Sequence, residues 1–155
     1  MSTQKDSSLR KQLIESNHSV KIVASGYSMF PFMRNGDIQT ISPVPIEEIQ
    51  IGDVAVFERN NVWISHRVID IRKTNNETIL ILRGDTCIQI DPLVTKENYV
   101  GKTVEFERGA KTINLNNRKI ASKRIIQLGL ARCYFLFYFK SALFIASRIK
   151  RKLIR

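Results

Sequence analysis

Ser28, His66 and two aspartates are the residues whose chemistry could combine into a nucleophilic site. Ser28 lies in a Gly-containing corner, after the apolar run 20–24 and before Pro31. A constrained corner can hold a hydroxyl in a fixed position, as a nucleophile requires. Serines beside Gly and Pro are also ordinary turn residues, so this stretch alone does not define a catalytic site.

A base and an acid are available elsewhere in the chain. Of the two histidines, His18 lies in the polar N-terminal region and His66 lies inside an apolar segment. Histidine is the commonest base for a serine, and it needs an acceptor that fixes its tautomer. Asp91 and Asp85 are two candidates for that acceptor. The spacing therefore allows a triad with Ser28, although a lone histidine in a strand is more often structural.

The elements that must hold these residues are short strands. Residues 20–114 are rich in Val, Ile, Thr and aromatic residues and are interrupted by turn dipeptides such as Gly84-Asp85. Such spacing, without long intervening helices, predicts a mainly β domain of short antiparallel strands. The predicted strands are Val20–Ala24, Ile38–Ser42, Val54–Glu58, Val62–Ile71, Thr78–Arg83, Ile88–Ile90 and Tyr99–Phe106.

The segments on either side of this domain have different compositions. Residues 1–19 predict a polar N-terminal arm that contains either a short helix over 7–16 or frayed chain, with no signal peptide or anchor. Residues 116–155 predict a long, basic and apolar C-terminal helix. Its part 128–146 reaches the length of a bilayer span, but Arg132 and Lys140 count against insertion. It suits membrane association, and packing on the domain or on a partner is the alternative.

The net charge of +11 belongs to the C-terminal region rather than to the domain. Residues 108–155 contain 13 Lys and Arg and no Asp or Glu, which leaves 12 basic and 14 acidic residues in 1–107. A basic face of the kind that nucleic acid needs is therefore not indicated. Cys87 and Cys133 form neither a disulfide framework nor, with the histidines, a set of metal ligands. No metal or cofactor is implied.

Five segments, in order, resemble the motif boxes of the signal peptidase I superfamily of serine peptidases. They are GYSMFP (26–31) with NGD (35–37), IGDVAVF (51–57), HRVI (66–69), RGD (83–85) with Asp91 beyond it, and YVGKTV (99–104). The resemblance covers more than half of the chain. A histidine stands where most bacterial signal peptidases and LexA-like repressors use a lysine. In this respect the chain resembles the endoplasmic-reticulum and archaeal type.

The resemblance implies a LexA/signal peptidase-like β domain over residues 20–115 and a serine endopeptidase that cleaves leader or signal segments. It implies that Ser28 is the nucleophile and His66 the general base. Asp91 is the preferred acidic partner of the histidine, with Asp85 second. The peptide or protein substrate is expected to bind as an extended strand.

Two features depart from the family pattern. Gly26 occupies the position where some relatives supply an oxyanion hydroxyl, which leaves the Ser28 N–H as the expected donor. The membrane helix that typically precedes the serine is missing, which favours a cytoplasmic or membrane-associated enzyme that matures a ribosomally made peptide. The alternatives are a non-catalytic peptide-binding module and a LexA-like self-cleaving regulator. The short N-terminal arm, which is too small for a DNA-binding domain, counts against the regulator.

Overall fold

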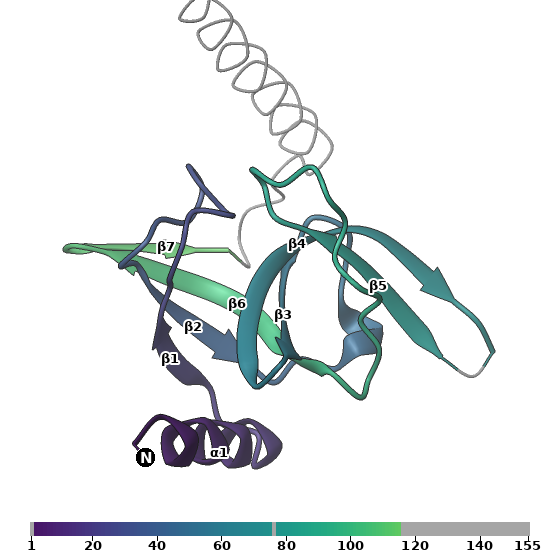
Figure 1. Cartoon of the computed structure of the whole chain (residues 1–155), viewed down its shortest axis with the longest axis horizontal. Helices are drawn as coiled ribbons and strands as arrows, with labels where there is room; N and C mark the ends of the chain where they lie inside the picture. The colour runs from purple at the N-terminus through teal and green to yellow at the C-terminus, as the bar shows by residue number, and fades with distance from the viewer. Residues whose placement is uncertain (1, 76, 116–155) are drawn as a thin grey trace, which may run out of the picture.

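In the computed structural model, which describes residues 2–75 and 77–115, one antiparallel sheet of seven strands forms the body of the molecule (Figure 1). The strand order is β1-β2-β6-β3-β4-β5, with β7 paired to β6. The mainly β, antiparallel fold predicted from the sequence is confirmed. The strands are β1 (Val20–Val23), β2 (Ile38–Ser42), β3 (Val54–Arg59), β4 (Val62–Lys73), β5 (Thr78–Arg83), β6 (Tyr99–Arg108) and β7 (Lys111–Asn114).

One predicted strand is wrong, and one strand was not predicted. Residues 88–90 form an irregular loop in which Ile88 and Ile90 are 59% and 57% exposed, so their apolar character does not reflect a place in the sheet. Strand β7 is short and polar and carries no alternating apolar pattern. It forms because Gly109, with φ of 58°, turns the chain back onto the end of β6.

The N-terminal region is helical over α1 (Ser2–Glu15), so the helix begins earlier than the sequence predicts. Figure 1 shows α1 beside β1 at one end of the sheet. A short 3-10 helix, η1 (Ile46–Glu48), follows β2. The predicted C-terminal helix over 116–155 and its membrane association lie outside the described residues. No helix in the described ranges is both long and apolar enough to cross a bilayer.

The hydrophobic core supports the segments that carry the candidate site. Under β3, β4 and β5, buried side chains such as Phe57, Val68 and Leu82 form one cluster. A second cluster contains Met29 and Met33, from the connection between β1 and β2, packed with residues that include Val54 and Phe106. The loop that carries Ser28 and strand β4, which carries His66, therefore both pack against buried apolar clusters.

Candidate active site

Ser28 lies in a closed loop between β1 and β2. At the base of this loop, the Ala24 N–H donates to the Asp37 carbonyl at 2.7 Å, and the Gly36 N–H donates to the Ala24 carbonyl at 2.9 Å. Met29, the residue after the serine, is 3% exposed and anchors the loop to the core. The loop is fixed at its base and beside Ser28, which limits the positions that the hydroxyl can take.

The Asp37 side chain ties the same loop to β6. Its carboxylate accepts hydrogen bonds from Nε and Nη2 of Arg108 at 3.0 and 2.7 Å, and from the Arg34 N–H at 2.8 Å. Burial alone would raise the pKa of Asp37. The hydrogen bonds from Arg108 and the Arg34 N–H, with the charges of both arginines, outweigh burial and hold the pKa below its usual value. Asp37 therefore has a structural role, because it holds the loop that carries Ser28 against β6.

His66 lies on β4, opposite Ala55 of β3, and its ring lies 6.3 Å from that of Phe57. The residue is 8% exposed. Its Nε2 is 2.9 Å from the Ser28 Oγ, and its Nδ1 is 2.6 Å from the Asp91 Oδ2. A carboxylate only accepts hydrogen bonds, so Nδ1 donates to Asp91, and in the neutral imidazole Nε2 is left to accept from the Ser28 hydroxyl.

Asp91 reaches His66 from the loop between β5 and β6. This loop runs back beside β5: the Asp91 N–H donates to the Leu82 carbonyl at 2.9 Å, and Leu80 and Val94 form an isolated antiparallel bridge. Because β5 is the neighbour of β4 in the sheet, a residue next to β5 comes within reach of the histidine. The side chain of Asp91 is 11% exposed.

Asp85, the second candidate partner of His66, is used elsewhere. Its two carboxylate oxygens accept from Nε and Nη2 of Arg67, both at 2.7 Å. Arg67 is 1% exposed, donates to the Gly52 carbonyl at 2.8 Å and stacks over the Phe32 ring at 4.5 Å. Such a bidentate, buried pair is a structural clamp. The structure therefore brings Asp91, and not Asp85, to the histidine.

The turn after β5 also holds Ser28 directly. Thr86 donates to the Ser28 carbonyl through its N–H at 2.9 Å and through its hydroxyl at 3.1 Å. A Cβ atom on Gly84 would lie 2.9 Å from the same carbonyl oxygen, a contact that only glycine avoids. The sequence predicts a turn at Gly84-Asp85 but gives no indication that Thr86 contacts Ser28. The close approach between two distant segments carries no local sequence signal.

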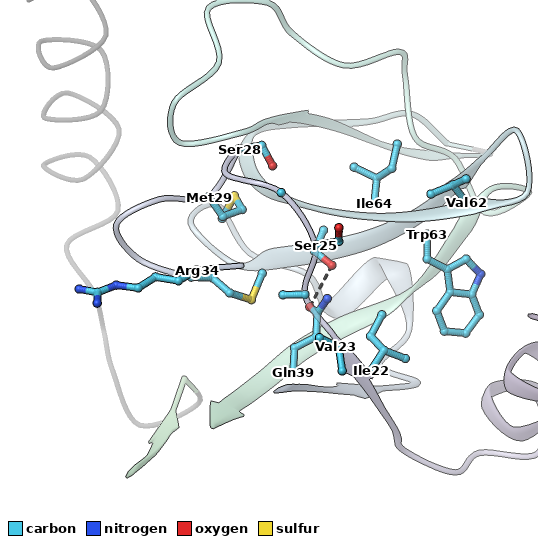
Figure 2. A pocket seen from close by; sticks show the side chains of 14 residues that line it. Ile22, Val23, Ser25, Ser28, Met29, Arg34, Gln39, Val62, Trp63 and Ile64 are labelled. Atoms are coloured by element: carbon cyan, nitrogen blue, oxygen red, sulfur yellow. Dashed lines mark hydrogen bonds between the residues drawn. The ribbon is translucent and has the colours of Figure 1, made fainter. Parts of the chain in front are cut away.

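A cleft of about 270 Å³ runs from Ser28 between β1 and the first half of β4 (Figure 2). Both sides of this cleft are strand edges with no partner in the described sheet. Strand β1 is the end of the strand order, and β5 pairs with β4 only from Arg67 onwards. The Ala24 N–H points toward β2, so by alternation the N–H and C=O of Val23 point to the open edge.

This arrangement can activate a hydroxyl and can accept an extended chain beside it. The Ser28 N–H has no hydrogen-bond partner among the described residues, so it is available as a donor near the serine oxygen. Within residues 2–75 and 77–115, no group of three or more His, Cys, Asp or Glu is arranged to hold a metal ion. The chemistry that the described site offers is nucleophilic attack by Ser28 with His66 as the proton acceptor.

A scan of the sequence against protein-family models found no matching family, and a search of the curated proteins found no matching protein. We therefore infer the function of this chain from its own residues and their geometry.

Proposed function

We propose that this protein is a serine endopeptidase of the signal-peptidase type, with a LexA/signal peptidase-like catalytic domain, that cleaves leader or signal segments of peptides or proteins. The observation that carries the proposal is the continuous chain of contacts from the Ser28 Oγ through both ring nitrogens of His66 to Asp91, at 2.9 and 2.6 Å. Nucleophile, base and orienting acid stand in the order that acyl transfer needs.

The proposed reaction follows from this order. The His66 Nε2 takes the Ser28 proton as the Ser28 Oγ attacks the substrate carbonyl carbon, and Asp91 stabilises the imidazolium that forms. The Ser28 N–H stabilises the developing oxyanion. His66 then gives the proton to the leaving amine, and the peptide bond breaks. A water molecule, deprotonated by the same histidine, releases the acyl group and regenerates Ser28.

The two open strand edges support the proposed mode of substrate binding. An extended peptide in the cleft could form main-chain hydrogen bonds with β1, at Val23, and with the first half of β4. Strand addition gives affinity through the main chain and leaves selectivity to the side-chain pockets. This mode also favours unfolded leader segments over folded domains, because only an extended chain can enter between two edges.

The proposal is tested by comparing protein N-termini, by mass spectrometry, between cells that carry the wild type and cells that carry Ser28→Ala. A set of N-termini that requires Ser28 supports a peptidase and identifies its cut sites. Ser19→Ala is the matched control, since Ser19 is an exposed serine outside this cleft whose hydroxyl forms a hydrogen bond with the Ser42 hydroxyl. If the N-termini are identical while the folded variant is present, the proposal fails and a non-catalytic peptide-binding module becomes the better account.

A further inference from the structure

The cleft beside Ser28 has apolar walls and a polar floor. Its walls include Ile22, Trp63 and Ile64, whereas Gln39, the second residue of β2, lies at its base (Figure 2). Gln39 is 3% exposed, although a glutamine side chain is usually found at the surface. A buried carboxamide must find partners for one oxygen and two N–H donors.

The oxygen of the Gln39 carboxamide is fully occupied. The Ser65 hydroxyl, on β4, and the Thr103 hydroxyl, on β6, both donate to the Gln39 Oε1 at 2.9 Å. These two bonds come from different strands and hold the carboxamide oxygen between β4 and β6. No hydrogen bond in the described part of the chain uses the Gln39 nitrogen, and Figure 2 shows the head group pointing into the cleft. The N–H donors therefore face the space where a substrate would lie.

We propose that Gln39 is a specificity-determining residue that selects a substrate side chain with an oxygen acceptor, namely Ser, Thr, Asn or Asp, at one position close to the scissile bond. This inference rests on the proposed peptidase function. A bound peptide displaces water from the cleft. An aliphatic side chain would leave the Gln39 N–H donors unpaired, whereas an oxygen acceptor would satisfy one of them. A site built to hydrogen-bond a side chain rejects the analogue that lacks the polar atom.

The test uses peptides that copy the Ser28-dependent cut sites found by N-terminal profiling. Each position next to the cut is replaced in turn by near-isosteric pairs, Thr or Val and Asn or Leu. We expect one position at which Thr exceeds Val, and Asn exceeds Leu, in kcat/KM by about 3- to 10-fold, as one net hydrogen bond provides. If the Gln39 N–H binds a water molecule beneath any small side chain, the paired peptides are cut equally, and the inference is overturned.

Two variants of Gln39 separate specificity from folding. Gln39→Glu keeps an oxygen for the Ser65 and Thr103 hydroxyls but puts an acceptor in place of the N–H donors. Because an Asp side chain can only accept, whereas Thr and Asn can also donate, we expect Asp to be cut most slowly by this variant. Gln39→Met should abolish the preference for Thr over Val. Thr103→Val removes one hydrogen bond to the Gln39 Oε1 but leaves the nitrogen in the cleft, so the preference should persist.

Failure of the inference is distinguishable from failure of the proposed function. If Ser28→Ala abolishes no cleavage, there is no peptidase and the function itself fails. If Ser28-dependent cleavage occurs, but Gln39→Met keeps the wild-type ratio for the paired peptides and Gln39→Glu cuts Asp as well as Asn, then Gln39 does not contact the substrate side chain. Only a preference for Thr over Val that is lost in Gln39→Met, together with selective loss of cleavage at Asp in Gln39→Glu, supports the inference.

Discussion

Gly84 packs directly against Ser28: a Cβ atom at Gly84 would lie 2.9 Å from the Ser28 carbonyl oxygen and 3.0 Å from the Ser28 Cβ. The same atom would lie 2.8 Å from the Cys87 Sγ. Because atoms cannot approach this closely, a side chain at position 84 would force either the loop between β1 and β2 that carries Ser28 (the serine loop) or the turn after β5 to move. The position of Ser28 is therefore coupled to a glycine that lies more than fifty residues away in the sequence.

This contact predicts that Gly84→Ala inactivates the protein while the sheet remains folded. A displacement of about 1 Å between reacting groups can cost about 100-fold in rate, so we expect a loss of this order. The measurement is the rate at which a fluorophosphonate probe labels Ser28, with circular dichroism as the check on folding. Gly109→Ala, at the β6–β7 hairpin, is the control for general destabilisation: its φ of 58° strains an alanine, but a Cβ there meets no atom within 4 Å, so the variant should lower Tm and still label at the wild-type rate.

A second variant distinguishes the two contacts of Gly84. Cys87→Ala removes the sulfur that a Gly84 methyl group would meet, but the Ser28 backbone contact remains. We therefore expect the double variant Gly84→Ala, Cys87→Ala to stay inactive. Recovery of labelling in the double variant would mean that the sulfur, and not the serine backbone, is the obstacle, and the proposed coupling would be wrong.

The different partners of Asp91 and Asp85 predict different defects. Asp91→Asn leaves the histidine without a carboxylate at Nδ1, and an amide partner can hold the wrong tautomer, so we expect labelling of Ser28 to slow by about 10³- to 10⁴-fold with little change in Tm. Asp85→Asn should instead lower Tm, because it weakens the clamp on Arg67. If Asp85→Asn abolished labelling without loss of stability, the assignment of Asp91 would be contradicted.

Arg67 is the buried half of that clamp, and its removal should be costly. Arg67→Met leaves Asp85 buried without its ion pair, which is expected to reduce the free energy of unfolding by about 3–5 kcal/mol. Arg67→Lys should recover only part of this, because an ammonium group cannot reproduce two parallel N–H donors. Urea unfolding followed by fluorescence measures both. The double variant Arg67→Met, Asp85→Leu should be more stable than Arg67→Met alone, since no charge is then left unpaired.

The sequence predicts six of the seven strands because their apolar and β-branched residues are bounded by turn residues. It also brings Ser28, His66 and Asp91 together in one hypothesis. Spacing alone left Asp91 and Asp85 as alternatives, because the choice depends on how the loop after β5 runs back beside Leu82, which is a tertiary contact.

Other features of the site depend on contacts between distant segments and could not be predicted from the local sequence. Gln39 occurs in an ordinary strand pattern, and its role in the cleft emerges only when β4 and β6 supply hydroxyls to its oxygen. At residues 88–90 the apolar residues predict a strand, but the chain there forms a loop without a partner in the described sheet. Apolar composition predicts burial only where a neighbouring element is available to cover the side chain.

The ion pair between Asp37 and Arg108 predicts how the serine loop responds to acid. The folded protein holds the pKa of Asp37 below the usual value of 3.8, so near and below that value the unfolded chain binds the proton more readily than the folded one. The stabilisation is therefore complete above about pH 5 and is lost as pH falls through the folded pKa. We expect the urea midpoint of the wild type to fall steeply below pH 4.

Asp37→Asn should remove part of that acid dependence and should also be less stable than the wild type at pH 7, because the guanidinium of Arg108 loses its charged acceptor. Urea unfolding at several pH values between 2 and 7 measures both effects. Asp70→Asn is the matched control, since the exposed Asp70 carboxylate accepts from the Ile71 N–H and not from an arginine. Equal slopes of stability against pH for the wild type and Asp37→Asn would show that Asp37 does not set the acid response.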